Sequence, residues 1–304
     1  MDRNRELLSA CCCRPAKYSR KCAYNLRVRH QPQTARKRGK SPNIPESERN
    51  VGLARAISKL GFCSRTEAAA LVAAGRVRLN GAVRKNPQTP VQLTSDKIEI
   101  DGQAVRAAQK VYWMLNKPRG TVTTAADEKG RQTVYDHFPV DLAWLAPVGR
   151  LDKVSEGLLL LTNDSEWAAR ILAPETHLEK IYHVQVRTIA DEHLLEGMRR
   201  GVSAGGDFLR VSRASILRRG ERNSWLEIVL DEGKNRQIRR LLQALGVATI
   251  RLVRVAIGPV QLGDLKKEGS RALTSAEKMA IDAAMERTTH AKEIGGKRTS
   301  GGNQ

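Results

Sequence analysis

A polar loop followed at once by a wholly apolar run is the feature that most limits how this chain can fold. Residues 158–161 are four consecutive leucines, bounded by Gly157 and by the polar residues 162–164. A short apolar run with such borders is typical of a strand that is covered on both faces. The loop ahead of it, residues 149–156, concentrates charges and hydroxyl groups. We therefore expect Asp152 to lie at the rim of the core, partly dried, where a carboxylate needs a cationic partner to stay ionised.

Composition alone favours an ordinary surface loop at this position, because charged loops are far more common than active-site carboxylates. The order of the residues indicates more. Gly149 to Asp152 read Gly-Arg-Leu-Asp, and after two further residues the chain continues as Ser-x-Gly-Leu-Leu-Leu-Leu-Thr-Asn-Asp. This series resembles the signature of the pseudouridine synthases that act on ribosomal RNA, in the branch with an N-terminal S4-like RNA-binding domain. The resemblance implies that Asp152 is the catalytic residue.

The chain is strongly basic, with a formal net charge of +21. Residues 1–45 hold twelve Lys and Arg against Asp2 and Glu6, and the rest of the excess lies in the C-terminal tail and in the part expected to fold. A chain with this positive charge favours a polyanionic partner whose phosphates it neutralises, although a basic protein that is merely soluble can have the same charge. No apolar run is long enough to span a bilayer, so we expect no contact with a membrane.

Cysteine and histidine usage indicates neither a metal nor a disulfide framework. Four of the five cysteines lie in the first 22 residues, at Cys11, Cys12, Cys13 and Cys22, and lack the paired spacing of a zinc site. We interpret them as reduced thiols, which fits a cytoplasmic protein. The six histidines show no metal-ligand spacing, and no dinucleotide fingerprint is present. We therefore expect no metal and no cofactor.

A length of 304 residues suggests two folded domains. Changes in composition, together with the resemblance, divide the chain into a disordered basic arm over 1–48, an S4-like RNA-binding domain over 49–108, a pseudouridine synthase catalytic domain over 110–286 and a disordered tail over 287–304.

Two short helices and several paired strands are expected in the S4-like domain over 49–108. Ser64 and Glu67 have the spacing of a capping box at a helix start, and Asn80 with Gly81 forms a strong hairpin-turn signal. The runs Leu-Gly-Phe-Cys-Ser-Arg-x-Glu-Ala and Gly-Arg-Val-x-Leu-Asn-Gly resemble the S4 RNA-binding domain. Ten Lys and Arg against four acidic residues could grip backbone phosphates. The residues expected to contact RNA here are Arg55, Lys59, Arg65, Arg76 and Arg78.

Three further stretches are similar to motifs of the same family: Asn-Lys-Pro-x-Gly at 116–120, Lys-x-Tyr at 180–182 and Gln-Ile-Arg at 237–239. From the residues alone, the first is a turn after a strand and Tyr182 is half-buried packing. The resemblance implies that Tyr182 stacks on the base and assists proton removal, and that Arg239 pairs with Asp152. Further residues expected to face RNA are Lys117, Arg150, Lys180, Arg236 and Arg240.

The predicted fold class is α+β, with a small S4-like α/β module followed by a catalytic domain built on a mixed, mainly antiparallel sheet. The resemblance implies isomerisation of a uridine to pseudouridine in 16S or 23S ribosomal RNA, or in a ribosome assembly intermediate, by a monomer. Asp152 would act either as nucleophile at the ribose carbon or by initiating proton removal from the sugar. Which RNA, which uridine and which route are left open.

Two other functions would share some of these features. A non-catalytic RNA-binding or ribosome-assembly protein would share the RNA affinity, but only an enzyme requires Asp152, Tyr182 and Arg239 together. A hydrolytic glycosidase using Asp152 and Glu156 lacks a second carboxylate marked out as an acid, and it leaves the basic module unexplained.

Overall fold

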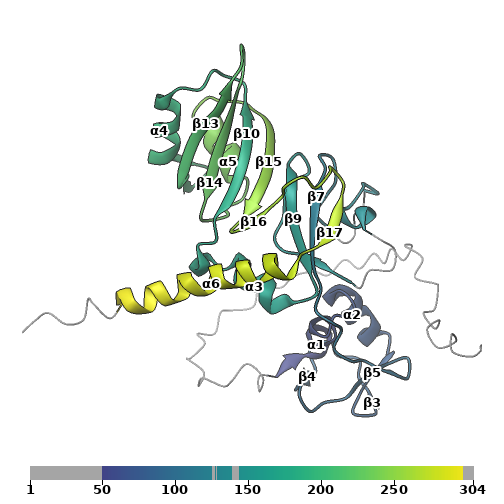
Figure 1. Cartoon of the computed structure of the whole chain (residues 1–304). Helices are drawn as coiled ribbons and strands as arrows, with labels where there is room; N and C mark the ends of the chain where they lie inside the picture. Colours follow the sequence, from purple (N-terminus) through teal and green to yellow (C-terminus); the bar gives the residue numbers. More distant parts are fainter. Residues whose placement is uncertain (1–49, 125–126, 128, 139–143, 297–304) are drawn as a thin grey trace, which may run out of the picture. The chain divides into compact units, whose positions relative to one another are not determined.

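The computed structural model describes residues 50–124, 127, 129–138 and 144–296 (Figure 1). Contacts divide the chain into Met1–Ile44 and Pro45–Gln304, and the first unit lies outside the described residues, as do the predicted basic arm and its four cysteines. No helix within the described part is long and apolar enough to cross a membrane.

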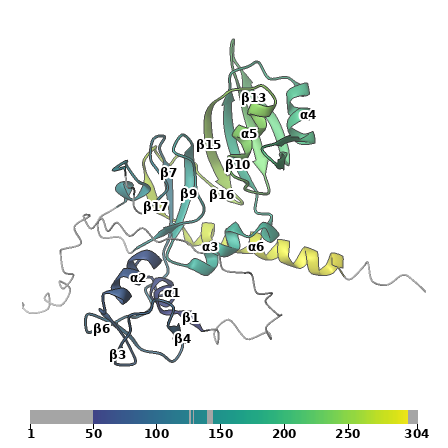
Figure 2. The ribbon, with the colours of Figure 1, turned by 180° about the vertical axis from the view of Figure 1, so that it is seen from behind.

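Residues 50–105 form two helices and short antiparallel strands (Figure 2). The Ser64–Glu67 capping box is present, since the Ser64 side chain accepts from the backbone of Glu67 and the Glu67 carboxylate accepts from the backbone of Ser64. Asn80 and Gly81 both have positive φ, 52° and 80°, as the expected hairpin turn requires. The elements are β1 (Val51–Gly52), α1 (Leu53–Lys59), α2 (Arg65–Ala73), β2 (Val77–Leu79), β3 (Ala82–Val83), β4 (Pro90–Val91), β5 (Ile98–Ile100) and β6 (Gln103–Ala104).

A mixed sheet in the order β13-β14-β10-β15-β9-β7-β17 organises the rest of the described chain. Neighbours along it pair antiparallel except β15 and β9, which are parallel. The predicted α+β class is confirmed. The strands are β7 (Tyr112–Lys117), β8 (Ala146–Pro147), β9 (Glu156–Thr162), β10 (Lys180–Val186), β13 (Arg213–Arg219), β14 (Ser224–Leu230), β15 (Thr249–Ile257), β16 (Val260–Gln261) and β17 (Ser270–Ala272), with a separate hairpin of β11 (Val202–Ala204) and β12 (Asp207–Leu209).

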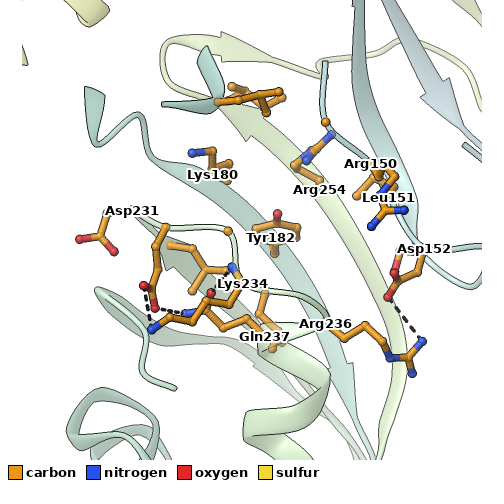
Figure 3. Close-up of a pocket in the computed structure, with 18 of the residues that line it drawn as sticks. Arg150, Leu151, Asp152, Lys180, Tyr182, Asp231, Lys234, Arg236, Gln237 and Arg254 are labelled. Atoms are coloured by element: carbon orange, nitrogen blue, oxygen red, sulfur yellow. Dashed lines mark hydrogen bonds and ion pairs between the residues drawn. The ribbon is translucent and has the colours of Figure 1, made fainter. Parts of the chain in front are cut away.

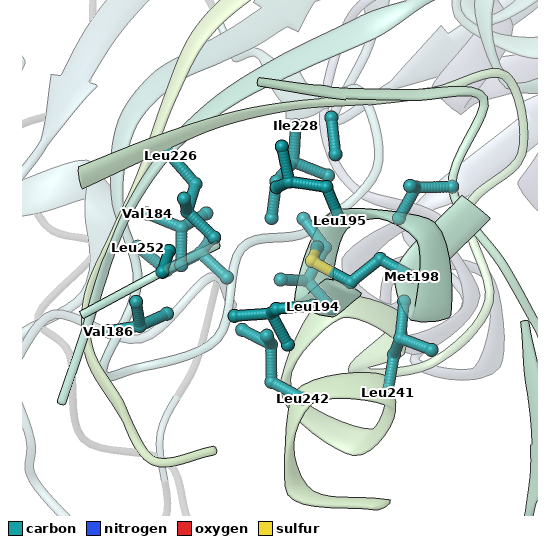
Figure 4. Close-up of a cluster of buried hydrophobic side chains, with 14 of the residues drawn as sticks. Val184, Val186, Leu194, Leu195, Met198, Leu226, Ile228, Leu241, Leu242 and Leu252 are labelled. Carbon is teal, nitrogen blue, oxygen red and sulfur yellow. The ribbon is translucent and has the colours of Figure 1, made fainter. Parts of the chain in front are cut away.

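Helices cover this sheet through two main cores. α4 (Glu192–Arg200) and α5 (Gln237–Ala244) pack Leu194, Met198 and Leu241 onto β10, β14 and β15 (Figure 4). α3 (Ser165–Leu172) and α6 (Ser275–Gly296) contribute Trp167 and Ile281 to the core beside β7 and β9. Two 3-10 turns, η2 (Val134–His137) and η3 (Pro174–Thr176), complete the described elements.

The four consecutive leucines at 158–161 lie in strand β9, and every residue of this strand is buried. Leu158 and Leu160 enter the core that holds α3 and α6, whereas Leu159 and Leu161 enter a separate core with Val134. The prediction of a strand covered on both faces is therefore confirmed.

The C-terminal boundary differs from expectation. A disordered tail was expected over 287–304, but α6 continues to Gly296. Residues 287–294 contain no proline or glycine, and helix formers such as Ala291, Lys292 and Glu293 extend the helix to Gly295 and Gly296. Residues 297–304 lie outside the described part.

Candidate active site

Strands β9 and β15 pair in parallel at Glu156 and Gly157, immediately after the loop that carries Asp152. Gly157 makes this junction possible, because its φ is +101° and its Cα lies against the backbone of Arg254. A Cβ at Gly157 would lie 2.8 Å from the amide nitrogen of Arg254 and closer still to its carbonyl oxygen. Only glycine therefore lets the two strands approach here, and their approach sets where the loop of Asp152 begins.

Each backbone carbonyl from 151 to 155 accepts a hydrogen bond, which fixes the loop that presents Asp152. The Lys117 ammonium donates to the carbonyls of Asp152 at 3.1 Å and Ser155 at 2.9 Å, and the Ser155 amide also donates to Asp152. The Gly120 amide donates to Lys153 at 2.7 Å. Thr123 Oγ1 donates to Leu151 at 2.8 Å, and Arg239 Nη2 donates to Val154 at 3.2 Å. The loop is thus held through its backbone carbonyls, and none of these hydrogen bonds uses the Asp152 carboxylate, which faces the cavity.

Lys117 was expected to contact RNA, and that prediction is wrong. Its side chain is 0% exposed, and its third hydrogen bond goes to the carbonyl of Pro118. Burial lowers the pKa of Lys117 to about 8, against the opposing effect of Asp152 and Glu156. Strand β7 pairs Lys117 with Gly157 of β9, so the ammonium lies under the loop rather than on the surface.

The buried ammonium gives a pH-dependent contribution to stability. Because the pKa of Lys117 is about 8 in the fold and about 10.4 when unfolded, the unfolded chain binds the extra proton between these values. The free energy of unfolding of the wild type, relative to Lys117→Met, is therefore expected to be constant below pH 8 and to rise from pH 8 to about 10.5. Urea unfolding of both proteins across this range measures the difference. A difference that stays flat or falls above pH 8 contradicts the assignment.

A cavity of about 490 Å³ opens beside the loop. Asp152, Tyr182 and Arg239 all line it, so the three residues to which the resemblance assigns catalytic roles come together from the loop, β10 and α5. Figure 3 shows Asp152 and Tyr182 at this cavity. Its apolar walls include Leu252 and Ile257. Six cationic residues against three acidic ones line it, which favours an anionic ligand: Arg150, Lys180, Lys234, Arg236, Arg239 and Arg254 against Asp152, Asp231 and Glu232.

The partner of Asp152 differs from the expected one. Arg236 Nη1 lies 3.6 Å from Asp152 Oδ2, whereas Arg239 bonds to the backbone of Val154 and lies 3.5 Å from Ser155 Oγ. Arg236 adopts the left-handed conformation with φ 49° immediately before α5, which turns its side chain toward the loop. Burial, then the charge of Arg236, lowers the pKa of Arg239, while Asp152 opposes this shift. Arg239 thus holds the loop of Asp152 without forming the expected ion pair.

The remaining predicted RNA contacts occupy varied positions. Arg150 and Arg236 are exposed at the cavity, and Lys180 is half-buried in its wall. Arg240 donates to Asp207 at 2.7 Å and to the carbonyl of Ala204, so it fixes the β11–β12 turn. In the basic module, Lys59 forms an ion pair with Glu166 at 2.9 Å. Four others are exposed, one of which, Arg76, is paired with Asp101: Arg55, Arg65, Arg76 and Arg78.

Sequence reasoning missed Arg254. This arginine occupies an inward position of β15, between the buried residues Leu252 and Ala256, and it lines the cavity. The signal in the sequence that could have identified it is an arginine at a position where the alternating pattern of the strand calls for an apolar residue. Among the described residues, no group of His, Cys, Asp and Glu could hold a metal ion.

Comparison with known proteins places this chain in one family. A family model described as RNA pseudouridylate synthase matches residues 111–244, and the S4 domain model matches residues 51–98. The chain belongs to the RNA pseudouridine synthase family.

Individual relatives agree with this assignment. An uncharacterised RNA pseudouridine synthase of Rickettsia typhi is 37% identical over 215 residues, which are 70% of this chain and 88% of that protein. The ribosomal large subunit pseudouridine synthase B of Bacillus subtilis is 35% identical over 228 residues, covering 74% of this chain and 93% of that protein. A crystal structure of a pseudouridylate synthase superposes with a TM-score of 0.54 at 29% identity and covers 76% of this chain and 99% of the other.

Proposed function

We propose that this protein isomerises a specific uridine of ribosomal RNA to pseudouridine, as a cytoplasmic monomer that needs no cofactor. The observation that carries the proposal is the loop 151–155, whose carbonyls are all bonded and which presents Asp152 to a cationic cavity lined by Tyr182. The relative from Bacillus subtilis, by its name a large-subunit enzyme, supports ribosomal RNA as the substrate class.

The reaction requires that the bond from uracil N1 to the ribose breaks, that the base turns, and that C5 joins the same sugar carbon. The target nucleotide must leave its helix to reach Asp152, which we propose attacks the ribose or starts proton removal from it. Tyr182 stacks on the detached uracil and assists removal of the C5 proton. Arg239 keeps the loop of Asp152 in place through Val154, and Arg236 supplies the counter-ion.

The basic module ahead of the sheet is proposed to hold the RNA. Its exposed guanidinium groups at Arg55, Arg65 and Arg78 can contact backbone phosphates, which fixes position without reading sequence. At the cavity, Arg150 and Arg236 are exposed and suit the phosphates that flank the target nucleotide.

The geometry gives no support to a glycosidase that uses Asp152 with Glu156. Glu156 is only 6% exposed, and its two carboxylate oxygens accept from Arg251 at 3.1 and 2.9 Å. A carboxylate bound in this way does not serve as a general acid at a sugar.

Base-resolution mapping of pseudouridine tests the function. Ribosomal RNA from cells that lack the gene is modified with carbodiimide and read by primer extension, with the gene re-supplied as wild type or as Asp152→Asn. We expect one uridine to lose its modification and only the wild type to restore it. An unchanged map in every strain, or restoration by both proteins, would leave a non-catalytic RNA-binding role instead.

A further inference from the structure

Arg254 is a buried cation whose hydrogen bonds are incomplete. Its side chain is only 6% exposed, and its Nε donates to the carbonyl of Leu158 at 2.7 Å. Its Nη2 is buried and has no acceptor among the described residues, and no acidic side chain there forms an ion pair with it. A buried donor without an acceptor is destabilising, and more so when it carries charge. Such a group in the wall of a cavity indicates an acceptor that arrives with the ligand.

The strand register places Arg254 beside the residue that is proposed to carry the base. Tyr182 of β10 is the cross-strand partner of Arg254 of β15, so both side chains start on the same face of the sheet. Lys180 lies two residues before Tyr182 on that face, and all three line the cavity (Figure 3). A base that lies on the Tyr182 ring would therefore have an edge within reach of these two cations.

The two cations affect each other electrostatically. Burial lowers the pKa of Lys180, the charge of Arg254 lowers it further, and Asp231 opposes the shift. Two positive groups that are held together at a partly dry site match an anion, or a group that becomes anionic during the reaction.

Uracil becomes such a group when it leaves the ribose. The bond between C1′ and N1 breaks with its electron pair remaining on N1, and resonance spreads this negative charge onto the carbonyl oxygens O2 and O4. If Asp152 attacks, its carboxylate oxygen forms the new bond to C1′. The charge is absent before the bond breaks, so donors at O2 or O4 stabilise the transition state more than the bound substrate.

We propose, on the basis of the function proposed above, that Arg254 donates a hydrogen bond to a uracil carbonyl oxygen and, with Lys180, stabilises the detached base as an anion. The target's phosphates are the less suitable acceptors for Arg254. Arg150 is exposed at the same cavity and can reach phosphates. Lys234 and Arg236 are exposed there as well, beside their partners Glu232 and Asp152, whereas Arg254 is buried in the cavity wall. Arg254 is thus a catalytic residue of the base-binding site.

Atom replacement in the substrate tests this contact. Transcripts carry the target uridine, or 2-thiouridine or 4-thiouridine in its place, or a phosphorothioate on its 5′ side, and each is reacted in single turnover with wild type and with Arg254→Lys. Sulfur accepts hydrogen bonds poorly, so the wild type is expected to slow about tenfold on one of the two thiouridines. Arg254→Lys is expected to slow about 10²-fold on uridine and to lose its discrimination against that same thiouridine.

Two further variants make the result interpretable. Arg219→Lys also changes a guanidinium whose Nε bonds to a backbone carbonyl, that of Ala190 at 2.9 Å, but Arg219 lies outside the cavity lining. Its rates are expected to match the wild type on all transcripts. If Arg254→Lys does not fold, as judged by circular dichroism, Lys180→Gln supplies the same comparison, with a smaller loss on uridine and reduced discrimination.

The outcomes separate this inference from the proposed function. If the wild type forms no pseudouridine in the uridine transcript, the proposed function is wrong. The contact to the base is overturned if the wild type reacts equally fast with uridine and with both thiouridines. It is also overturned if the variants slow on each thiouridine by the same factor as the wild type does. Lost discrimination against the phosphorothioate alone assigns Arg254 to a phosphate and overturns it as well.

Discussion

Replacing Asp152 by asparagine is expected to lower the rate of the chemical step at least about 10³-fold, with little change in RNA affinity. Asparagine has the same size but neither the charge nor the nucleophilicity of the carboxylate. The loop itself should persist, because Lys117, Gly120, Thr123 and Arg239 bind its backbone carbonyls and not the Asp152 side chain. The ion pair with Arg236 is half-exposed and contributes at most about 1 kcal/mol. Single-turnover kinetics on a transcript measures the rate, filter binding measures the RNA affinity, and thermal melting measures the stability.

The matched control is Asp264→Asn, which removes one carboxylate from an exposed position outside the cavity lining. Its rate is expected to equal that of the wild type. If Asp152→Asn kept more than about a tenth of the wild-type rate, Asp152 would not be the reacting group. If it lost rate and RNA affinity in equal measure, Asp152 would act in binding instead of in the chemical step.

Gly157→Ala is expected to lower the free energy of unfolding by about 4 kcal/mol or more, measured by urea denaturation. The added Cβ collides with the backbone of Arg254, which a small side-chain movement cannot relieve. The φ of +101° adds strain of about 1–2 kcal/mol. Separation of β9 from β15 would also displace the start of the Asp152 loop, so activity is expected to fall with stability.

Gly120→Ala separates the two effects at Gly157. Gly120 has a φ of +100°, almost that of Gly157, but its Cβ would meet no atom within 4 Å. The variant therefore reports strain without collision and is expected to cost only about 1–2 kcal/mol. If both glycine variants lose the same stability, the close approach of β9 and β15 is not what requires glycine at Gly157.

Local features of the chain could be predicted because their causes lie within a few residues. The capping box at Ser64, the turn at Asn80 and Gly81, and the doubly covered strand β9 all follow from neighbouring side chains and backbone preferences. The family resemblance depended on short motifs in the same way, and the family models agree with it over residues 51–98 and 111–244. The helical end of α6 was missed where the two glycines at 295 and 296 were interpreted as part of a longer disordered tail.

The positions of Lys117, Arg254 and Arg236 depend on contacts between distant parts of the chain. Lys117 is buried because β7 pairs with β9, which brings it beneath a loop 35 positions away. Arg254 enters the cavity wall because β15 runs alongside both β9 and β10. Arg236 reaches Asp152 because its left-handed conformation redirects the side chain just before α5 begins.

The sequence by itself thus determined which residue types could do the chemistry and on which local elements they lie. It did so because periodicity, capping and turn preferences are short-range effects. Only the tertiary structure decided which cation meets Asp152, which lysine supports the loop and which arginine lies buried in the cavity wall. Those outcomes are set by pairing between strands that lie far apart in the sequence and by the burial that such pairing imposes on each charged group.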